Sequence, residues 1–146
     1  MHGLDDFLTA TYDRQVEAET AIHNGDAEPR LAMWSEHDPM TLYGAAVSMS
    51  GAADVREFFQ RLAARFSDCT SYRFEVVAAG ASGDLAYTVG YEHTSTSIDG
   101  VPVEPYVLRV THVYRREDGE WKIVHRHADT PPADQTALAD AVSAND

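Results

Sequence analysis

Two histidines near the C-terminal end of this chain have a type and a spacing that suit catalysis. His125 and His127 lie two positions apart, so in a regular β-strand their side chains share one face. An imidazole has an unperturbed pKa of about 6.5, which lets it give or take a proton near neutral pH. A carboxylate such as Asp38 or Asp129 could fix the tautomer of a neighbouring histidine. The pattern indicates acid/base chemistry on a small molecule.

Other kinds of chemistry have less support in the sequence. Three imidazoles with a carboxylate would suit zinc or iron, but no HExxH or comparable spacing is present, so we expect no metal. Cys69 has no evident partner for nucleophilic catalysis, and Ser48 and Ser50 lie in a flexible loop without a nucleophile-elbow motif. We therefore predict a protein that works without a metal or a cofactor.

Composition limits the partners of the chain. Its 146 residues match the size of one domain with one hydrophobic core. A net charge of −13, from 24 acidic residues against 11 Lys and Arg, predicts no binding to nucleic acid or to anionic membranes. The lone cysteine excludes an intramolecular disulfide, and no apolar run reaches the roughly 18 residues of a membrane span. We therefore expect a soluble cytoplasmic protein.

Hydrophobic periodicity predicts helices first and strands afterwards. Apolar residues recur three to four positions apart, as in amphipathic helices, over residues 4–24, 26–35 and 54–66. Residues 40–43 have the composition of a short strand. After Cys69 the period changes to two, which predicts strands over residues 72–76, 87–93, 105–116 and 120–128. Helices followed by an antiparallel meander indicate an α+β fold.

The last predicted hairpin carries a resemblance to known families. Residues 109–116 read RVTHVYRR, a turn follows at Asp118-Gly119, and residues 121–129 read WKIVHRHAD. This hairpin closely resembles SnoaL-like sequences of the nuclear transport factor 2-like superfamily, which also includes ketosteroid isomerases. It resembles the calcium/calmodulin-dependent kinase association domain as well. Shorter matches of the same kind occur at residues 24–26, 34–39 and 51–59.

The resemblance implies a cone-shaped fold, in which three N-terminal helices pack on a strongly bent antiparallel sheet. It implies one SnoaL-like domain at residues 1–132, followed by an acidic Ala/Asp-rich tail at residues 133–146. Residues 45–51 would form a lid above the first strand. A homodimer is also implied, because this sheet usually buries its outer face against a second copy. The apolar residues predicted for that face are Val110, Tyr114, Val124 and Tyr72.

The resemblance does not extend to the catalytic groups of ketosteroid isomerase. That enzyme uses an Asp base at the end of the first strand, and this place falls on Tyr43 here. Its oxyanion hole uses a Tyr and a protonated Asp, whose places fall on Ala18 and on either Leu108 or Thr111. A Tyr is a poor base because its pKa is about 10. Classical steroid isomerisation is therefore not expected.

A cone of this kind leaves a pocket between the helices and the concave face of the sheet, and the histidines and aromatic residues are predicted to line it. The residues predicted to take part in proton transfer are His112, His127, His93 and Tyr43. The residues predicted to contact the ligand are Trp34, Tyr87, Tyr91, Phe59, His125 and Asp38. His112 is predicted to face inward, because the kinase association domain has a pocket-facing Arg at that place. A β-bulge would decide which of His125, Arg126 and His127 faces inward.

Two functions remain open. The first is an acid/base enzyme of the isomerase, cyclase or dehydratase type that acts on a small hydrophobic organic molecule. In this enzyme a histidine moves the proton, and Tyr43 or Tyr91 donates a hydrogen bond. The alternative is a non-catalytic ligand-binding or oligomerisation module of the same fold, which the absence of the isomerase groups favours.

Overall fold

The computed structural model describes residues 3–132 and 141–143, and within residues 3–132 it has three helices and seven strands. The helices are α1 (Gly3–Ile22), α2 (Glu28–Met33) and α3 (Ala52–Ala63). The strands are β1 (Thr41–Tyr43), β2 (Ser48–Ser50), β3 (Phe66–Ser82), β4 (Leu85–Ile98), β5 (Val101–Pro102), β6 (Tyr106–Glu117) and β7 (Glu120–Asp129). Within these described residues, no helix has the length and apolar character needed to cross a membrane. Of the predicted tail, only residues 141–143 belong to the described part.

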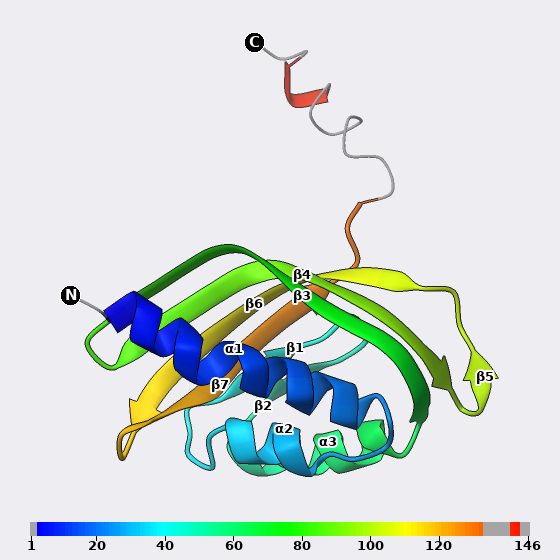
Figure 1. Cartoon of the computed structure of the whole chain (residues 1–146), viewed down its shortest axis with the longest axis horizontal. Coiled ribbons are helices and arrows are strands. Elements are labelled where there is room, and N and C mark those ends of the chain that lie inside the picture. The colour runs from blue at the N-terminus through cyan, green and yellow to red at the C-terminus, as the bar shows by residue number, and fades with distance from the viewer. Residues whose placement is uncertain (1–2, 133–140, 144–146) are drawn as a thin grey trace.

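The strands form one curved sheet in the order β2-β1-β7-β6-β4-β3, and β5 pairs with β4. Figure 1 shows this sheet arching over α1, with α2 and α3 on the open side of the arch. The α+β prediction is therefore confirmed. The prediction of a purely antiparallel sheet is wrong at one edge, where β1 runs parallel to β7 and Leu42 lies beside Arg126. The chain between these strands contains the rest of the sheet, so no local pattern encodes their pairing.

The sheet bends around α1 where β3 passes Gly90 of β4. A β-bulge in β3 lies beside this glycine. A Cβ atom on Gly90 would be 2.0 Å from the carbonyl oxygen of Glu75, so no other residue fits there unless β3 moves. The bend brings β3 onto α1, where the Tyr12 hydroxyl donates a hydrogen bond of 2.8 Å to the carbonyl of Phe74.

A second bulge determines which residues of β7 face the interior. The pairing of β6 with β7 shifts by one residue at Val124. Ile123 and Arg126, on either side of this shift, are therefore both buried on the inner face. His125 and His127 lie on the outer face.

The hydrophobic core packs aromatic side chains from the helices against the inner face of the sheet. Phe7 of α1 meets Tyr114 of β6 edge to face, with ring centroids 4.8 Å apart. Trp34 and Phe59 make the same kind of contact at 4.7 Å. The prediction that Val110 and Tyr114 cover the outer face is wrong, since both are fully buried on the inner face of β6.

The segment predicted as a lid, residues 45–51, is partly a strand. Its residues Ser48–Ser50 form β2, which pairs antiparallel with β1 and places Met49 opposite Leu42. The small residues that suggested a flexible loop are compatible with an edge strand. The prediction that Ser48 and Ser50 lie in a flexible loop is therefore wrong.

Candidate functional site

A cluster of buried charged side chains lies between α1 and the inner face of the sheet. Arg126 of β7 donates two hydrogen bonds, of 2.9 and 2.7 Å, to the carboxylate of Glu92 on β4. Arg30 of α2 makes a similar two-point ion pair with Glu19 of α1. The two pairs adjoin, because Arg126 Nη1 lies 3.7 Å from Glu19 Oε1. These four residues, together with His112, are called the interior cluster below.

His112 of β6 completes the interior cluster. Its imidazole is 1% exposed, and its Nε2 atom lies 3.1 Å from Arg126 Nη1. The ring of Trp34 meets the imidazole edge to face, with centroids 6.5 Å apart. The imidazole is thus held between an aromatic core residue and a buried ion pair, on the inward side that the resemblance predicts.

Uncharged hydrogen-bonding groups extend the interior cluster toward α1 and β3. The hydroxyl of Tyr72 donates to Glu92 at 2.7 Å, and the amide of Gln15 donates to the Tyr72 oxygen at 3.2 Å. The Tyr114 hydroxyl donates to Gln15 Oε1 at 3.3 Å. The prediction that Tyr72 lies on the outer face is wrong, because its side chain points inward and reaches Glu92.

The surroundings of the interior cluster set its protonation states. Burial alone would raise the pKa of Glu92, but the Arg126 guanidinium outweighs it and holds that pKa well below its usual range. Burial, and then Arg126, lower the pKa of His112 well below its usual value. Burial, and then Glu92, raise the pKa of Tyr72. Near neutral pH Glu92 is therefore an anion, whereas His112 and Tyr72 are uncharged.

Tyr87, Tyr91 and His93 share one face of β4, but that face is the outer one. They alternate with inward residues such as Glu92, which is buried beneath α1. His93 Nε2 lies 3.1 Å from the carboxylate of Glu75 on the outer face. The prediction that these three residues line the concave face is wrong, because a period of two shows which side chains share a face and not which face is covered.

The predicted residues His125, His127 and Tyr43 also meet on the outer face. The hydroxyl oxygen of Thr41 lies 2.6 Å from His125 Nδ1. The ring of Tyr43 stands edge to face with both imidazoles, at centroid distances of 5.6 and 5.8 Å. The predicted place of both histidines inside the cone is wrong because the bulge at Val124 turns Arg126 inward and the histidines outward. The predicted place of Tyr43 is wrong because it follows the buried residue Leu42 on β1 and so faces outward.

Three further residues predicted to contact the ligand instead stabilise the fold. Trp34 and Phe59 are core residues that pack on each other, and Trp34 alone of the two reaches the ring of His112. Asp38 is exposed, and its carboxylate accepts a 2.7 Å hydrogen bond from the backbone N–H of Ala52 at the start of α3. Asp38 therefore caps a helix, and its predicted place in the pocket is wrong.

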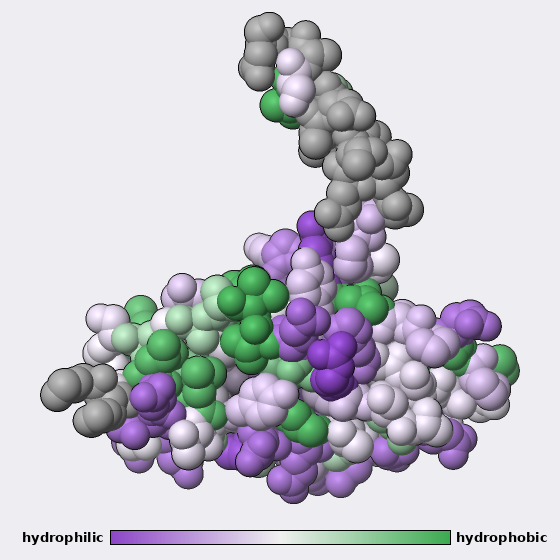
Figure 2. Space-filling model, turned by 45° about the horizontal axis from the view of Figure 1, so that its top comes forward, coloured by the Kyte–Doolittle hydropathy of each residue, from purple (hydrophilic) through white to green (hydrophobic). Residues whose placement is uncertain are grey.

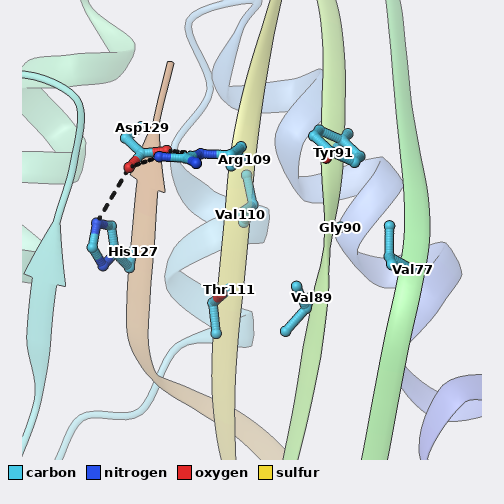
Figure 3. A pocket seen from close by; sticks show the side chains of 9 residues that line it. All are labelled: Val77, Val89, Gly90, Tyr91, Arg109, Val110, Thr111, His127 and Asp129. Carbon is cyan, nitrogen blue, oxygen red and sulfur yellow. Dashed lines mark hydrogen bonds and ion pairs between the residues drawn. The ribbon is translucent and has the colours of Figure 1, made fainter. Parts of the chain in front are cut away.

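A hollow of about 290 Å³ lies on the outer face of the sheet, over the middle of the long strands (Figure 3). Tyr91 and His127 line it, together with Arg109 and Asp129. Arg109 donates two hydrogen bonds, of 2.6 and 2.7 Å, to Asp129 and so lowers the pKa of that carboxyl. His127 Nε2 lies 3.8 Å from Asp129 Oδ2, which is an ion-pair distance and not a hydrogen bond. Asp129 is therefore engaged by Arg109 and does not fix the tautomer of His127.

Comparison with models of protein families assigns the chain to a family. The model of the SnoaL-like domain matches residues 11–133. The chain belongs to the SnoaL-like family. A comparison of this SnoaL-like protein with curated proteins found no match.

Solved structures share the SnoaL-like fold. A candidate dehydratase of the nuclear transport factor 2-like family from Streptomyces avermitilis is 18% identical, with a TM-score of 0.70, over 88% of this chain and 99% of its own. A candidate calcium/calmodulin-dependent protein kinase type II association domain from Thiobacillus denitrificans is 18% identical, with a TM-score of 0.63, over 85% of this chain and 91% of its own. A nuclear transport factor 2-like protein with a cystatin-like fold from Novosphingobium aromaticivorans is 19% identical, with a TM-score of 0.63, over 92% of this chain and 90% of its own. At such identities these likenesses show the fold alone, and it is the family match over residues 11–133 that confirms the predicted SnoaL-like family.

The sequence interpretation missed three members of the interior cluster of this SnoaL-like protein, Glu19, Arg30 and Glu92, and it named Arg126 only as one of three residues that a β-bulge could turn inward. Glu19 gave a usable signal, since it falls on the buried face of α1 beside Ile22. A carboxylate in that position is rarely buried unless it is paired. Arg30 and Glu92 gave no comparable signal, because α2 has only six residues and because the sequence does not show which face of β4 is covered.

Proposed function

We propose that this SnoaL-like protein binds a small hydrophobic organic molecule inside the cone and moves a proton on it, as an isomerase, cyclase or dehydratase does. The observation that carries the proposal is the interior cluster. Replacing a buried ion pair with apolar side chains of similar size often leaves a protein equally stable or makes it more stable. The presence of two adjoining buried ion pairs is therefore not explained by stability alone. Ionisable groups with strongly shifted pKa values gather at functional sites.

His112 is the group proposed to activate the ligand: its imidazole donates a hydrogen bond to a carbonyl oxygen, and a water molecule takes the proton from the carbon next to that carbonyl group. Burial, and then Arg126, lower its pKa, so its imidazole is uncharged near neutral pH. An uncharged imidazole can polarise a carbonyl group by donating a hydrogen bond. His93, His127 and Tyr43 lie on the outer face, so of the four residues predicted to take part in proton transfer only His112 faces the interior. The description of the Streptomyces neighbour as a candidate dehydratase supports the reaction type, through likeness of fold.

Hydrogen exchange next to a ketone tests this proposal, because it is the elementary step of these reactions. Cyclohexanone in deuterium oxide serves as the probe, and proton NMR follows the loss of its α-hydrogens. We expect the protein to accelerate this exchange and His112→Gln to lower the acceleration about 100-fold or more. The matched control is His125→Gln on the outer face, which should exchange at the wild-type rate. An identical rate for the wild type, for His112→Gln and for buffer would refute the proposal.

A second role, self-association, is favoured by the outer face of the sheet. Val77, Leu85 and Tyr87 are 60%, 57% and 43% exposed. Figure 2 looks onto this side of the molecule and shows apolar side chains gathered there. A hollow of about 800 Å³ at the end of the β3–β4 hairpin is lined by Leu85, Tyr87 and Val113 among others. Exposed apolar patches of this kind commonly mark a protein contact.

The proposed partner on this face is a second copy of the chain. Charged groups near the patch pair with each other, Arg109 with Asp129 and Arg73 with Glu75, so the face carries little net charge. The chain as a whole carries −13, and two copies would repel each other over most other surfaces. The description of the Thiobacillus neighbour as a candidate association domain supports this role, again through likeness of fold.

A further inference from the structure

Two buried polar atoms inside the cone have no hydrogen-bond partner among the described residues 3–132 and 141–143. They are Nδ1 of His112 and Oγ1 of Thr88. The two residues are 1% and 3% exposed. They lie directly opposite each other in the pairing of β4 with β6, and both side chains are on the inner face. A polar atom that is buried without a partner is uncommon and calls for an explanation.

The contact with Arg126 determines which nitrogen of His112 carries the proton. A guanidinium has only donors, so Arg126 Nη1 donates to His112 Nε2 across 3.1 Å and Nε2 must accept. Burial and Arg126 lower the pKa of His112, so the ring carries one proton near neutral pH. That proton is therefore on Nδ1. Glu92 holds Arg126 in place by two further hydrogen bonds.

We infer that the Nδ1–H of His112 and the hydroxyl of Thr88 together bind the oxygen atom of an uncharged carbonyl group on the ligand, with Arg126 as the positioning residue that sets the tautomer. This inference rests on the function proposed above and names the chemical class of its substrate. A carbonyl oxygen has two lone pairs and accepts two hydrogen bonds. The two donors come from neighbouring strands and face the same interior.

The charges of the interior cluster favour an uncharged ligand. The two carboxylates, of Glu19 and Glu92, are balanced by the two guanidinium groups of Arg30 and Arg126. A carboxylate ligand would add a buried charge without a partner, which is costly in such surroundings. A protonated amine has no acceptor for the Nδ1–H of His112 and would add a buried positive charge. A ketone or an aldehyde meets both requirements.

The tautomer of His112 is the first test. Nitrogen-15 NMR on protein with labelled histidine should show His112 protonated at Nδ1 in the free protein. In the double variant Glu92→Leu/Arg126→Met, which removes both charges together, the protonated nitrogen should shift in part to Nε2. The proton would stay on Nδ1 of His112 in this variant if Arg126 only stabilised the fold. A proton on Nε2 in the wild type would overturn the inference.

Ligand binding is the second test, with four probes that share one six-membered ring. They are cyclohexanone, methylenecyclohexane, cyclohexylamine and cyclohexanecarboxylate, titrated by NMR. We expect cyclohexanone to bind most tightly and Thr88→Val to weaken it about fivefold without affecting methylenecyclohexane. Thr88→Ser keeps the hydroxyl and should bind the ketone like the wild type. Ketone binding no tighter than that of methylenecyclohexane, as expected if these atoms bind only a water molecule, would overturn the inference.

The two proposals can fail separately. Ketone binding that depends on Thr88, without any exchange of α-hydrogens, would refute the catalytic proposal and support the carbonyl site. Exchange that depends on His112, with ketone binding indifferent to Thr88→Val, would refute the carbonyl site alone.

Discussion

Arg126 and Glu92 bind each other across an intervening strand. Arg126 is on β7 and Glu92 is on β4, and β6 lies between them in the sheet. Both side chains reach over the inner face, where the Tyr72 hydroxyl donates to the same carboxylate. This arrangement keeps two opposite charges inside the protein, and it is tolerable only while each has its partner.

Removal of one charge of this pair should cost a large part of the stability. Glu92→Leu leaves Arg126 buried without its partner, and we expect the free energy of unfolding to fall by about 3–5 kcal/mol. Urea denaturation measures the change. Glu75→Leu removes a carboxylate from the outer face and should cost less than about 1 kcal/mol. The double variant Glu92→Leu/Arg126→Met should recover most of the loss, and an equally unstable double variant would contradict this account.

Stability should fall as the pH drops from about 6.5 to about 5. The pKa of His112 is lowered in the folded protein, first by burial and then by Arg126. Below about pH 6.5 the unfolded chain therefore takes up a proton that the folded chain does not bind, which favours unfolding. One such histidine contributes at most about 1.4 kcal/mol per pH unit. Burial also lowers the pKa of His23, which adds to the same slope.

The variant His112→Gln should reduce this slope, and urea midpoints at several pH values measure it. Glu92→Gln is the control. A carboxyl group whose pKa is lowered on folding stabilises the protein above about pH 4.3, and that contribution is lost only as the pH falls further. Glu92→Gln should therefore lower the stability at every pH between about 5 and 6.5 and leave the slope unchanged. An unaltered slope in His112→Gln would show that its imidazole is accessible to protons.

Self-association should depend on apolar side chains of the outer face. Sedimentation at micromolar concentration should give twice the chain mass of 16.1 kDa for the wild type. The double variant Val77→Glu/Leu85→Glu should sediment as a monomer, because it places charge in the proposed contact. Val101 on β5 is 61% exposed and serves as the matched position, so Val101→Glu should remain a dimer. A monomeric wild type would rule out the homodimer under these conditions.

Gly90 should be intolerant of any side chain. In Gly90→Ala the new methyl group would lie 2.0 Å from the carbonyl oxygen of Glu75, so β3 must move away from β4. We expect a loss of about 3 kcal/mol or more in the free energy of unfolding. Gly3→Ala at the start of α1 meets nothing within 4 Å and should change stability by less than about 0.5 kcal/mol. Thermal unfolding of both variants tests the difference, and an unchanged midpoint for Gly90→Ala would contradict the close approach.

The helices could be predicted from the sequence because their apolar faces repeat within a single element. The predicted segments 4–24 and 54–66 correspond to α1 (Gly3–Ile22) and α3 (Ala52–Ala63). The parallel pairing of β1 with β7 could not be predicted in the same way. Thr41 and His125 lie 84 residues apart, and the sequence of a three-residue strand is too short to predict which strand it pairs with.

The facing of the site residues could not be predicted because the inner face of β4 is polar. Thr88 and Glu92 point inward, whereas Tyr87 is exposed on the outside. The usual rule of apolar residues inside and polar residues outside therefore points to the wrong face. Arg126 could not be assigned to the interior for a different reason, since only the bulge at Val124 turns it inward.

The contact between β1 and β7 also bears on how the chain folds as a ribosome makes it. Translation delivers Leu42 early and its neighbour Arg126 late. Until the last strand emerges, β1 lacks the strand that ties it to the sheet, and the carboxylate of Glu92 lacks its counter-charge. Contacts between distant parts of a chain form slowly because a long loop must close first. Completion of the sheet and neutralisation of that carboxylate therefore occur together, once β7 has been made.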